Sequence, residues 1–183
     1  HLLTIADMLG ESTGKWWEDV TGDRAVQPAE YVRTGTPEDA YGPDELIEEL
    51  ADLSEQAVAA GEKGMRSASG EKELPSLARD AFCMGRLGEF YVERLKAALA
   101  HARGDDAEAV EHMNRALGLY REIRGLDSSH RGPITIVVDR EAMEYAWTAT
   151  IKALEAELAD ASTGRFRRGS EIAEHCINVH ING

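Results

Sequence analysis

The sequence predicts an all-α fold: an antiparallel bundle of about four long helices, preceded by an ordered, loop-rich segment. Apolar residues recur at spacings of three and four in the long segments, and proline and glycine fall between those segments. The one extended apolar stretch, from Ile134 to Val138, has no evident partner strand. With 183 residues the chain is long enough to bury its own core. We therefore expect a single helical domain, with a loop-rich segment at 1–42, the bundle at 43–161 and a tail at 162–183.

The longest apolar segment, from Leu74 to Arg103, predicts a central helix covered by neighbours on more than one side. Gly85 and Gly88 each cost about 1 kcal/mol relative to alanine inside a helix. Their spacing of three places them on one side, so we expect another backbone to approach closely there. The apolar line of this helix consists of Leu77, Ala81, Met84, Leu87, Tyr91, Leu95, Ala98 and Ala102.

Three further helices are predicted at 43–63, 105–124 and 139–161. Pro43 suits a first helical turn, and Gly61 and Gly64 predict the end of the same helix. Gly104 ends the central helix, and Asp105 or the residue after it caps the next one, which implies a tight antiparallel hairpin.

The connecting segments are less regular. Residues 1–10 predict a short helix, and the stretch after Gly125 predicts an extended crossover rather than a strand. The tail contains the basic run at 165–168, and residues 170–183 fit either a short helix or a strand.

Composition excludes several classes of function. The formal net charge of −14 argues against a nucleic-acid partner and against a basic membrane-surface helix. No apolar run approaches the roughly 18 residues that span a bilayer, so we expect a soluble protein without a membrane partner. Cys83 fits a small buried residue, with a disulfide to Cys176 as the alternative in an exported protein. The chain begins at His1 rather than Met, which predicts a piece of a multidomain protein with neighbouring domains as partners.

No motif indicates catalysis, a cofactor or a metal. A di-iron bundle needs Glu-x-x-His pairs, and the chain has none. His175, Cys176 and His180 are able to ligate a metal, but they lack the recurrent spacing of zinc ligands. There is no Gly-x-Ser-x-Gly elbow and no phosphate-binding loop. The sequence predicts a chain that is not itself an enzyme.

Two sets of residues are candidates for ligand binding. Asp80, Arg86 and Glu93 form a polar set on the central helix, for which the alternative is a solvated stripe of ion pairs that includes Arg94. The other set consists of aromatic residues in the glycine-rich N-terminal segment: Trp16, Trp17 and Tyr41. Exposed tryptophan and tyrosine rings stack on sugars, which favours a ligand-binding role. In the alternative interpretation, a ring packs against the core and anchors the loop.

Residues 16–61, from WWEDVTGD to EQAVAAG, and residues 77–123, from LARDAFCMG to LGLYREI, carry a resemblance. They resemble helical accessory regions that follow the catalytic domain of large multidomain bacterial glycoside hydrolases. In those regions a segment like Glu30-Tyr31-Val32 leads into a proline-started helix. The resemblance implies a non-catalytic module that binds a polysaccharide or glycan, outside the cell or in the periplasm.

The stretch ALAHARGDDAEAVEHMNRALGLY also resembles one hairpin of a tetratricopeptide repeat. The central helix is too long for such a repeat, and no 34-residue period recurs. A protein-interaction or structural spacer domain is therefore the alternative to carbohydrate binding. The interaction interpretation predicts an apolar or charged groove in place of an exposed aromatic platform.

Overall fold

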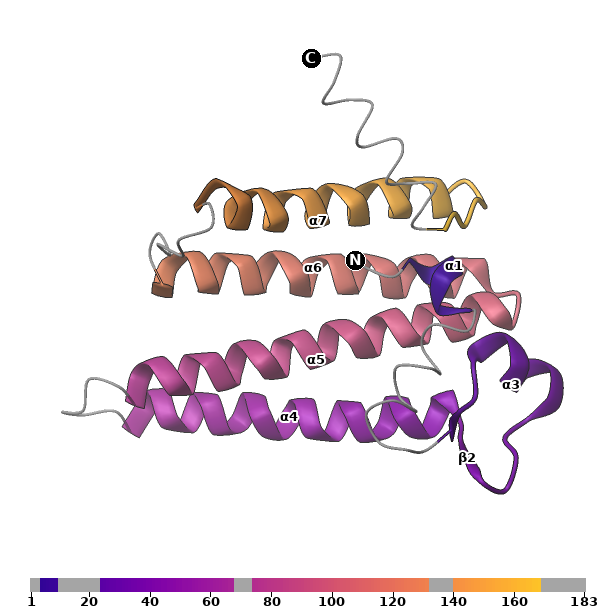
Figure 1. The fold of residues 1–183 in the computed structure, drawn as a ribbon, viewed down its shortest axis with the longest axis horizontal. Helices are drawn as coiled ribbons and strands as arrows, with labels where there is room; N and C mark the ends of the chain where they lie inside the picture. Colours follow the sequence, from indigo (N-terminus) through magenta and orange to yellow (C-terminus); the bar gives the residue numbers. More distant parts are fainter. Residues whose placement is uncertain (1–3, 10–23, 68–73, 132–139, 169–183) are drawn as a thin grey trace, which may run out of the picture.

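The computed structural model describes residues 4–9, 24–67, 74–131 and 140–168, and these residues form an all-α protein (Figure 1). The long helices are α4 (Pro43–Ser67), α5 (Leu74–Ala102), α6 (Asp106–Arg131) and α7 (Arg140–Ala161). The short elements are α1 (Ile5–Met8), β1 (Arg24–Ala25), α3 (Pro28–Thr34) and β2 (Ala40–Tyr41). The expected fold class is confirmed.

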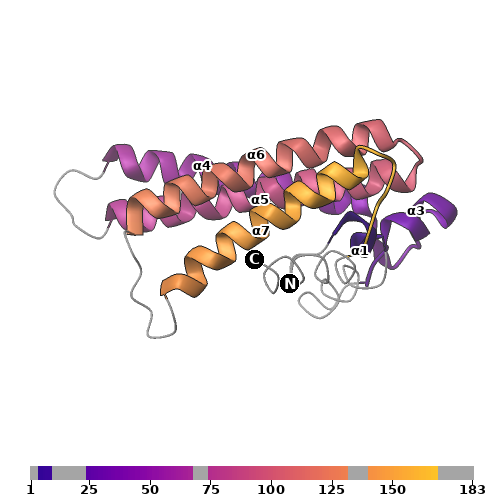
Figure 2. The same cartoon turned by 90° about the horizontal axis from the view of Figure 1, so that it is seen from above.

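The long helices lie side by side in chain order, each antiparallel to the one before it (Figure 1). Helix α5 packs against α4 on one side and α6 on the other, and α7 packs against α6. Figure 2 shows that α7 runs obliquely to the others. A shared apolar cluster joins α5, α6 and α7 through Phe90, Leu117 and Leu154. This arrangement makes α5 an internal helix, as its apolar sequence predicts.

Helices α4 and α5 cross closely because glycines, which have no side chain, lie at the contact. A Cβ added to Gly85 would lie 2.7 Å from the carbonyl oxygen of Ser54 and 2.7 Å from a methyl carbon of Val58. Reciprocally, a Cβ on Gly61 would lie 2.6 Å from the backbone nitrogen of Phe82. Real Cβ atoms do not come this close to backbone, so the predicted close approach is confirmed.

Two predicted helix ends are wrong. Helix α4 continues past Gly61 and Gly64 to Ser67, because these glycines pack against α5 and so gain contacts that offset their low helix propensity. Helix α6 likewise continues past Gly125 to Arg131, where we expected an extended crossover. No proline interrupts the helix between these two residues.

The apolar line of α5 is buried over only part of its length. Leu95, Ala98 and their neighbours are buried in the core that α1, α4, α6 and α7 share. Toward the N-terminal end of α5, Leu77, Met84 and Tyr91 are exposed, with 68 %, 65 % and 45 % of their surface accessible. The expectation that the whole line faces inward is therefore wrong for these positions. Leu53 on α4 is also exposed.

The N-terminal region is more regular than its composition predicts. Pro28 begins α3, and β1 pairs in parallel with β2, with Arg24 opposite Ala40. The Tyr31 hydroxyl donates a hydrogen bond of 2.7 Å to Asp44 at the start of α4, which ties α3 to the helices. Helix α3 lies within the segment 11–42 that its glycine and proline content predicts to be loop, although a proline at a first helical position is a signal for a helix.

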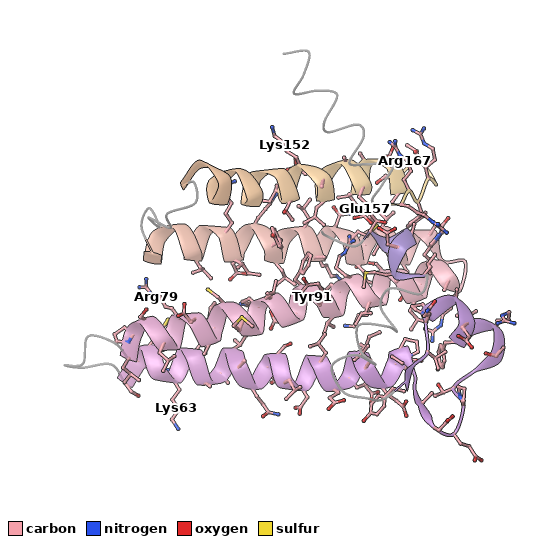
Figure 3. The ribbon with its side chains drawn as sticks, viewed as in Figure 1. Lys63, Arg79, Tyr91, Lys152, Glu157 and Arg167 are labelled. Carbon is pink, nitrogen blue, oxygen red and sulfur yellow. The ribbon has the colours of Figure 1, made fainter. Side chains whose placement is uncertain are left out.

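A buried ion pair joins α5 to α7. Arg94 donates hydrogen bonds of 2.6 Å and 3.3 Å to the two oxygens of Glu157, and the side chains are only 2 % and 3 % accessible. Figure 3 shows Glu157 on the side of α7 that faces α6, whereas Lys152 points away from the protein. The same carboxylate accepts a 2.5 Å hydrogen bond from the backbone N–H of Ile5, at the start of α1. Arg94 therefore does not belong to a solvated stripe.

Candidate functional site

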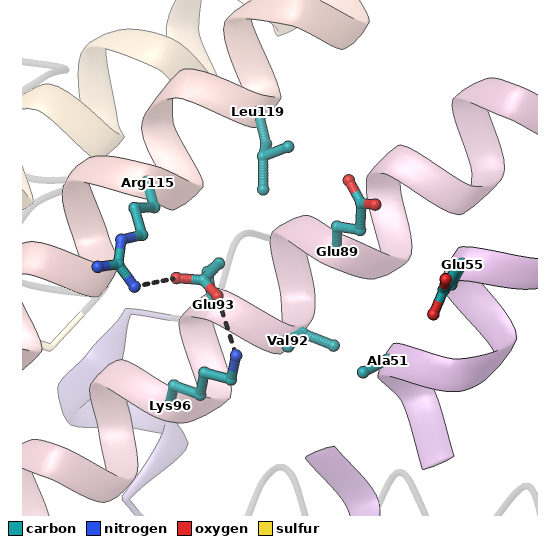
Figure 4. Close-up of a pocket in the computed structure, with 8 residues that line it drawn as sticks. All are labelled: Ala51, Glu55, Glu89, Val92, Glu93, Lys96, Arg115 and Leu119. Carbon is teal, nitrogen blue, oxygen red and sulfur yellow. Dashed lines mark hydrogen bonds and ion pairs between the residues drawn. The ribbon is translucent and has the colours of Figure 1, made fainter. Parts of the chain in front are cut away.

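An open groove of about 610 Å³ runs along α5 between α4 and α6, and it is the candidate ligand site (Figure 4). Its lining combines three apolar residues with five charged ones. The lining residues are Ala51 and Glu55 of α4, Glu89, Val92, Glu93 and Lys96 of α5, and Arg115 and Leu119 of α6.

Helical periodicity explains why these residues share one surface. The α5 residues lie three and four positions apart, so they follow one face of the helix. The two residues from α4 are four positions apart, as are the two from α6. Each helix thus contributes one short stripe, and the antiparallel packing brings the three stripes together.

Glu93 lies at the centre of a charged network. Its carboxylate accepts a hydrogen bond of 3.2 Å from the Lys96 ammonium and lies 2.7 Å from Nδ1 of His112 and 3.9 Å from Arg115. Burial by itself would raise the pKa of Glu93, but the hydrogen bonds from His112 and Lys96 outweigh it and hold the pKa below the ordinary value. Glu93 is therefore ionised at neutral pH.

Beside it, Glu89 belongs to a second network. Arg86 donates a 2.7 Å hydrogen bond to Glu89 and lies 3.5 Å from Glu122 of α6, with its guanidinium 5.2 Å from the centre of the Phe82 ring. The hydrogen bond to Glu89 raises the pKa of Arg86 further. This pairing holds the Glu89 carboxylate in place at the groove.

The structure brings only one of the predicted site residues into the groove. Glu93 lines it, and Arg86 reaches it indirectly through Glu89. Asp80, half-buried on α5, and Tyr41, half-buried in β2, are not among the lining residues. Trp16 and Trp17 lie outside the described residues, so their ligand role stays a prediction.

The groove presents carboxylates and cations to a ligand. Among the described residues, its lining contains no serine, threonine, cysteine, tyrosine or histidine. Glu93 is held ionised, so it offers a carboxylate and not a carboxylic acid. Over the described ranges, no group of three or more His, Cys, Asp or Glu side chains is placed to hold a metal ion. The proposed metal ligands of the tail and the Cys83–Cys176 pairing lie partly or wholly outside these ranges.

The residues of the site that were not singled out from the sequence as ligand candidates include Glu55, Glu89, Lys96, His112 and Arg115. The set of Asp80, Arg86 and Glu93 predicted only a polar face on the central helix. What the sequence lacked was the fact that α4 and α6 flank this face and complete the groove.

None of the helices in the described part of the chain is long and apolar enough to cross a membrane. No protein-family model, no curated protein and no solved structure matches the chain.

Proposed function

We propose that this chain is a non-catalytic interaction module that holds a segment of a partner protein, through a basic side chain, in the groove between α4 and α6. The observation that carries the proposal is the charged groove itself, whose α4 side contains a carboxylate without an ion-pair partner among the described residues. Glu55 is exposed and forms no ion pair with any residue that the structure describes.

Helix α4, which carries Glu55, is acidic over most of its length. Helix α4 has no basic residue before Lys63, and its exposed carboxylates include Glu45, Glu48, Glu49, Asp52 and Glu55. A strongly negative surface attracts basic partners over several ångströms and speeds their association. The net charge of −14 acts in the same direction.

A protein segment fits the groove better than a sugar does. Among the described residues, the lining contains no aromatic ring on which a sugar would stack, whereas Ala51, Val92 and Leu119 supply apolar surface for the stem of a lysine or arginine. The carbohydrate-binding interpretation depends on the resemblance and on Trp16 and Trp17. The experiment below distinguishes carbohydrate binding from peptide binding.

Fluorescence anisotropy tests the proposal with the 183-residue chain and two labelled peptides of equal length, one of alternating Lys and Ser and one of alternating Glu and Ser. We expect the lysine peptide to bind, with an affinity that falls as salt rises, and the glutamate peptide not to bind. The variant Glu55→Lys should weaken binding by about tenfold or more, which is about 1.4 kcal/mol.

The matched control is Glu38→Lys, which makes the same change in net charge at an exposed position outside the groove. If both variants weaken binding equally, the interaction depends on net charge and the groove proposal is wrong. Affinity gels that contain soluble polysaccharides provide the other arm. Retardation in such a gel, without peptide binding, would favour the carbohydrate-binding interpretation instead.

A further inference from the structure

The charges of the groove are separated along its length. Glu55 and Glu89 lie toward one end, and Lys96 and Arg115 lie around Glu93 toward the other (Figure 4). A ligand that lies in the groove therefore meets different charges at its two ends.

At one end, the exposed groups are cations. The Glu93 side chain is only 14 % accessible, whereas those of Lys96 and Arg115 are 38 % and 53 % accessible. Glu93 is already neutralised by its contacts with Lys96 and His112 and by Arg115 at 3.9 Å, so the groups that this end presents to solvent are mainly the two cations. Arg115 also pairs with Glu111 on α6.

Lys96 and Arg115 retain unused N–H hydrogen-bond donors for a ligand. An ammonium has three N–H donors and a guanidinium has five. Lys96 uses one hydrogen bond on Glu93, and Arg115 makes one hydrogen bond to Glu111 while its other terminal nitrogen lies 3.9 Å from Glu93. A carboxylate that approaches from solvent is thus able to accept hydrogen bonds from both.

At the other end, the exposed groups are anions. Arg86 donates to Oε2 of Glu89, which leaves Oε1 of that carboxylate to accept a hydrogen bond from a ligand. Glu55 of α4 lies toward the same end of the groove as Glu89 and has no ion-pair partner among the described residues. A lysine or arginine side chain placed between these carboxylates would be a counter-ion to both.

We infer that the groove selects a peptide segment with two opposite charges, its basic side chain between Glu55 and Glu89 and its acidic side chain at Lys96 and Arg115. The inference rests on the proposed function and adds the chemical class and the orientation of the ligand. Between the two charged contacts, the ligand lies over the apolar surface at Val92.

Three labelled peptides of equal length test the inference in the same anisotropy assay. The first carries a single Lys, the second a single Glu, and the third one Lys and one Glu separated by a serine and alanine spacer, which is varied in length. At one spacer length we expect the two-charge peptide to bind about tenfold more tightly than the single-Lys peptide. In the Lys96→Gln/Arg115→Gln double variant, this advantage should disappear while the single-Lys peptide binds as before or more tightly.

Arg121→Gln is the matched control, because Arg121 is an exposed cation on α6 that pairs with Glu155 outside the groove. It should leave the advantage of the two-charge peptide unchanged. If the two-charge peptide binds no better than the single-Lys peptide at any spacer length, the inference is wrong and the proposed function stands. If no peptide binds, the proposed function itself is wrong. The fold of each variant is checked by circular dichroism, and the single variant Arg115→Gln replaces the double variant if the latter is unfolded.

Discussion

Arg94 on α5 and Glu157 on α7 form a buried ion pair between residues 63 positions apart in the sequence. Both terminal nitrogens of the guanidinium donate to the carboxylate, which satisfies the geometry that a charged pair needs when it is removed from water. Removing two charges from water is costly, so such a pair stabilises little compared with apolar side chains of the same size. Its main effect is to penalise any packing that separates the two residues.

The first prediction concerns the loss of one partner. Arg94→Met leaves Glu157 buried, with the N–H of Ile5 as its one remaining donor among the described residues, and it should destabilise the fold by about 3–5 kcal/mol. The double variant Arg94→Met/Glu157→Leu should cost clearly less than the sum of the two single variants. Urea unfolding of the four proteins measures this coupling.

Arg121→Met is the control for this cycle. Arg121 and Glu155 also form an ion pair between helices, but both side chains are about half exposed. The loss of that pair should cost about 0–1 kcal/mol. Equal losses of unfolding free energy in Arg94→Met and Arg121→Met would contradict the conclusion that burial makes the loss of one partner costly.

The second prediction concerns the close crossing of α4 and α5. Gly85→Ala should destabilise the protein by about 1–3 kcal/mol, because the added methyl group meets the backbone of α4 at Ser54. Gly118→Ala on α6 should instead stabilise it by up to about 1 kcal/mol, because its added methyl group meets no atom within 4 Å and alanine is the better helix former. Thermal unfolding of both variants should therefore shift in opposite directions. Two shifts of the same sign would contradict the close crossing.

A third prediction separates the two halves of α5. Met84→Gln should change stability by no more than about 0.5 kcal/mol, because this side chain is exposed. Leu95→Ala, in the buried half, should cost about 2–5 kcal/mol. Chemical denaturation distinguishes these outcomes, and a large loss at Met84 would mean that this position is covered in solution.

A fourth prediction concerns acid pH. Because the pKa of Glu93 is lower in the folded protein than its ordinary value of 4.5, the unfolded chain binds the proton first as pH falls. The stabilisation by Glu93 is therefore complete well above pH 4.5 and is lost as pH falls through the folded-state pKa. Glu93→Gln should flatten the acid side of the curve of unfolding free energy against pH. An unchanged slope in this variant would rule out Glu93 as a source of the pH dependence.

The helices themselves were predictable because their signals are local. Pro43 begins α4, Gly104 adopts a positive φ after α5, and Asp105 accepts a hydrogen bond from the N–H of Glu108 as a cap. These features lie within a few residues of the boundaries that they set. The end of α4 was predicted wrongly at Gly61, because the helix continues through contacts with α5. The local sequence does not reveal that neighbouring helix.

The site was less predictable because it depends on which helices become neighbours. The face of α5 that holds Glu89 and Glu93 looks like an ordinary solvated stripe until α4 adds Glu55 and α6 adds Arg115. The burial of Arg94 had a signal, because Phe90 and Ala98 lie four positions away on either side and are buried. Its partner Glu157 follows buried Leu154 by three positions, yet no local pattern joins it to Arg94.

The hydrogen bond from Ile5 to Glu157 spans 152 residues, which sets an order for assembly. During synthesis α1 is made before α7, and the N–H of Ile5 gains the Glu157 carboxylate only when α7 has been made. A chain that stops before Glu157 therefore lacks the carboxylate that joins α1 to Arg94 of α5. Completion of the fold is thus coupled to completion of α7.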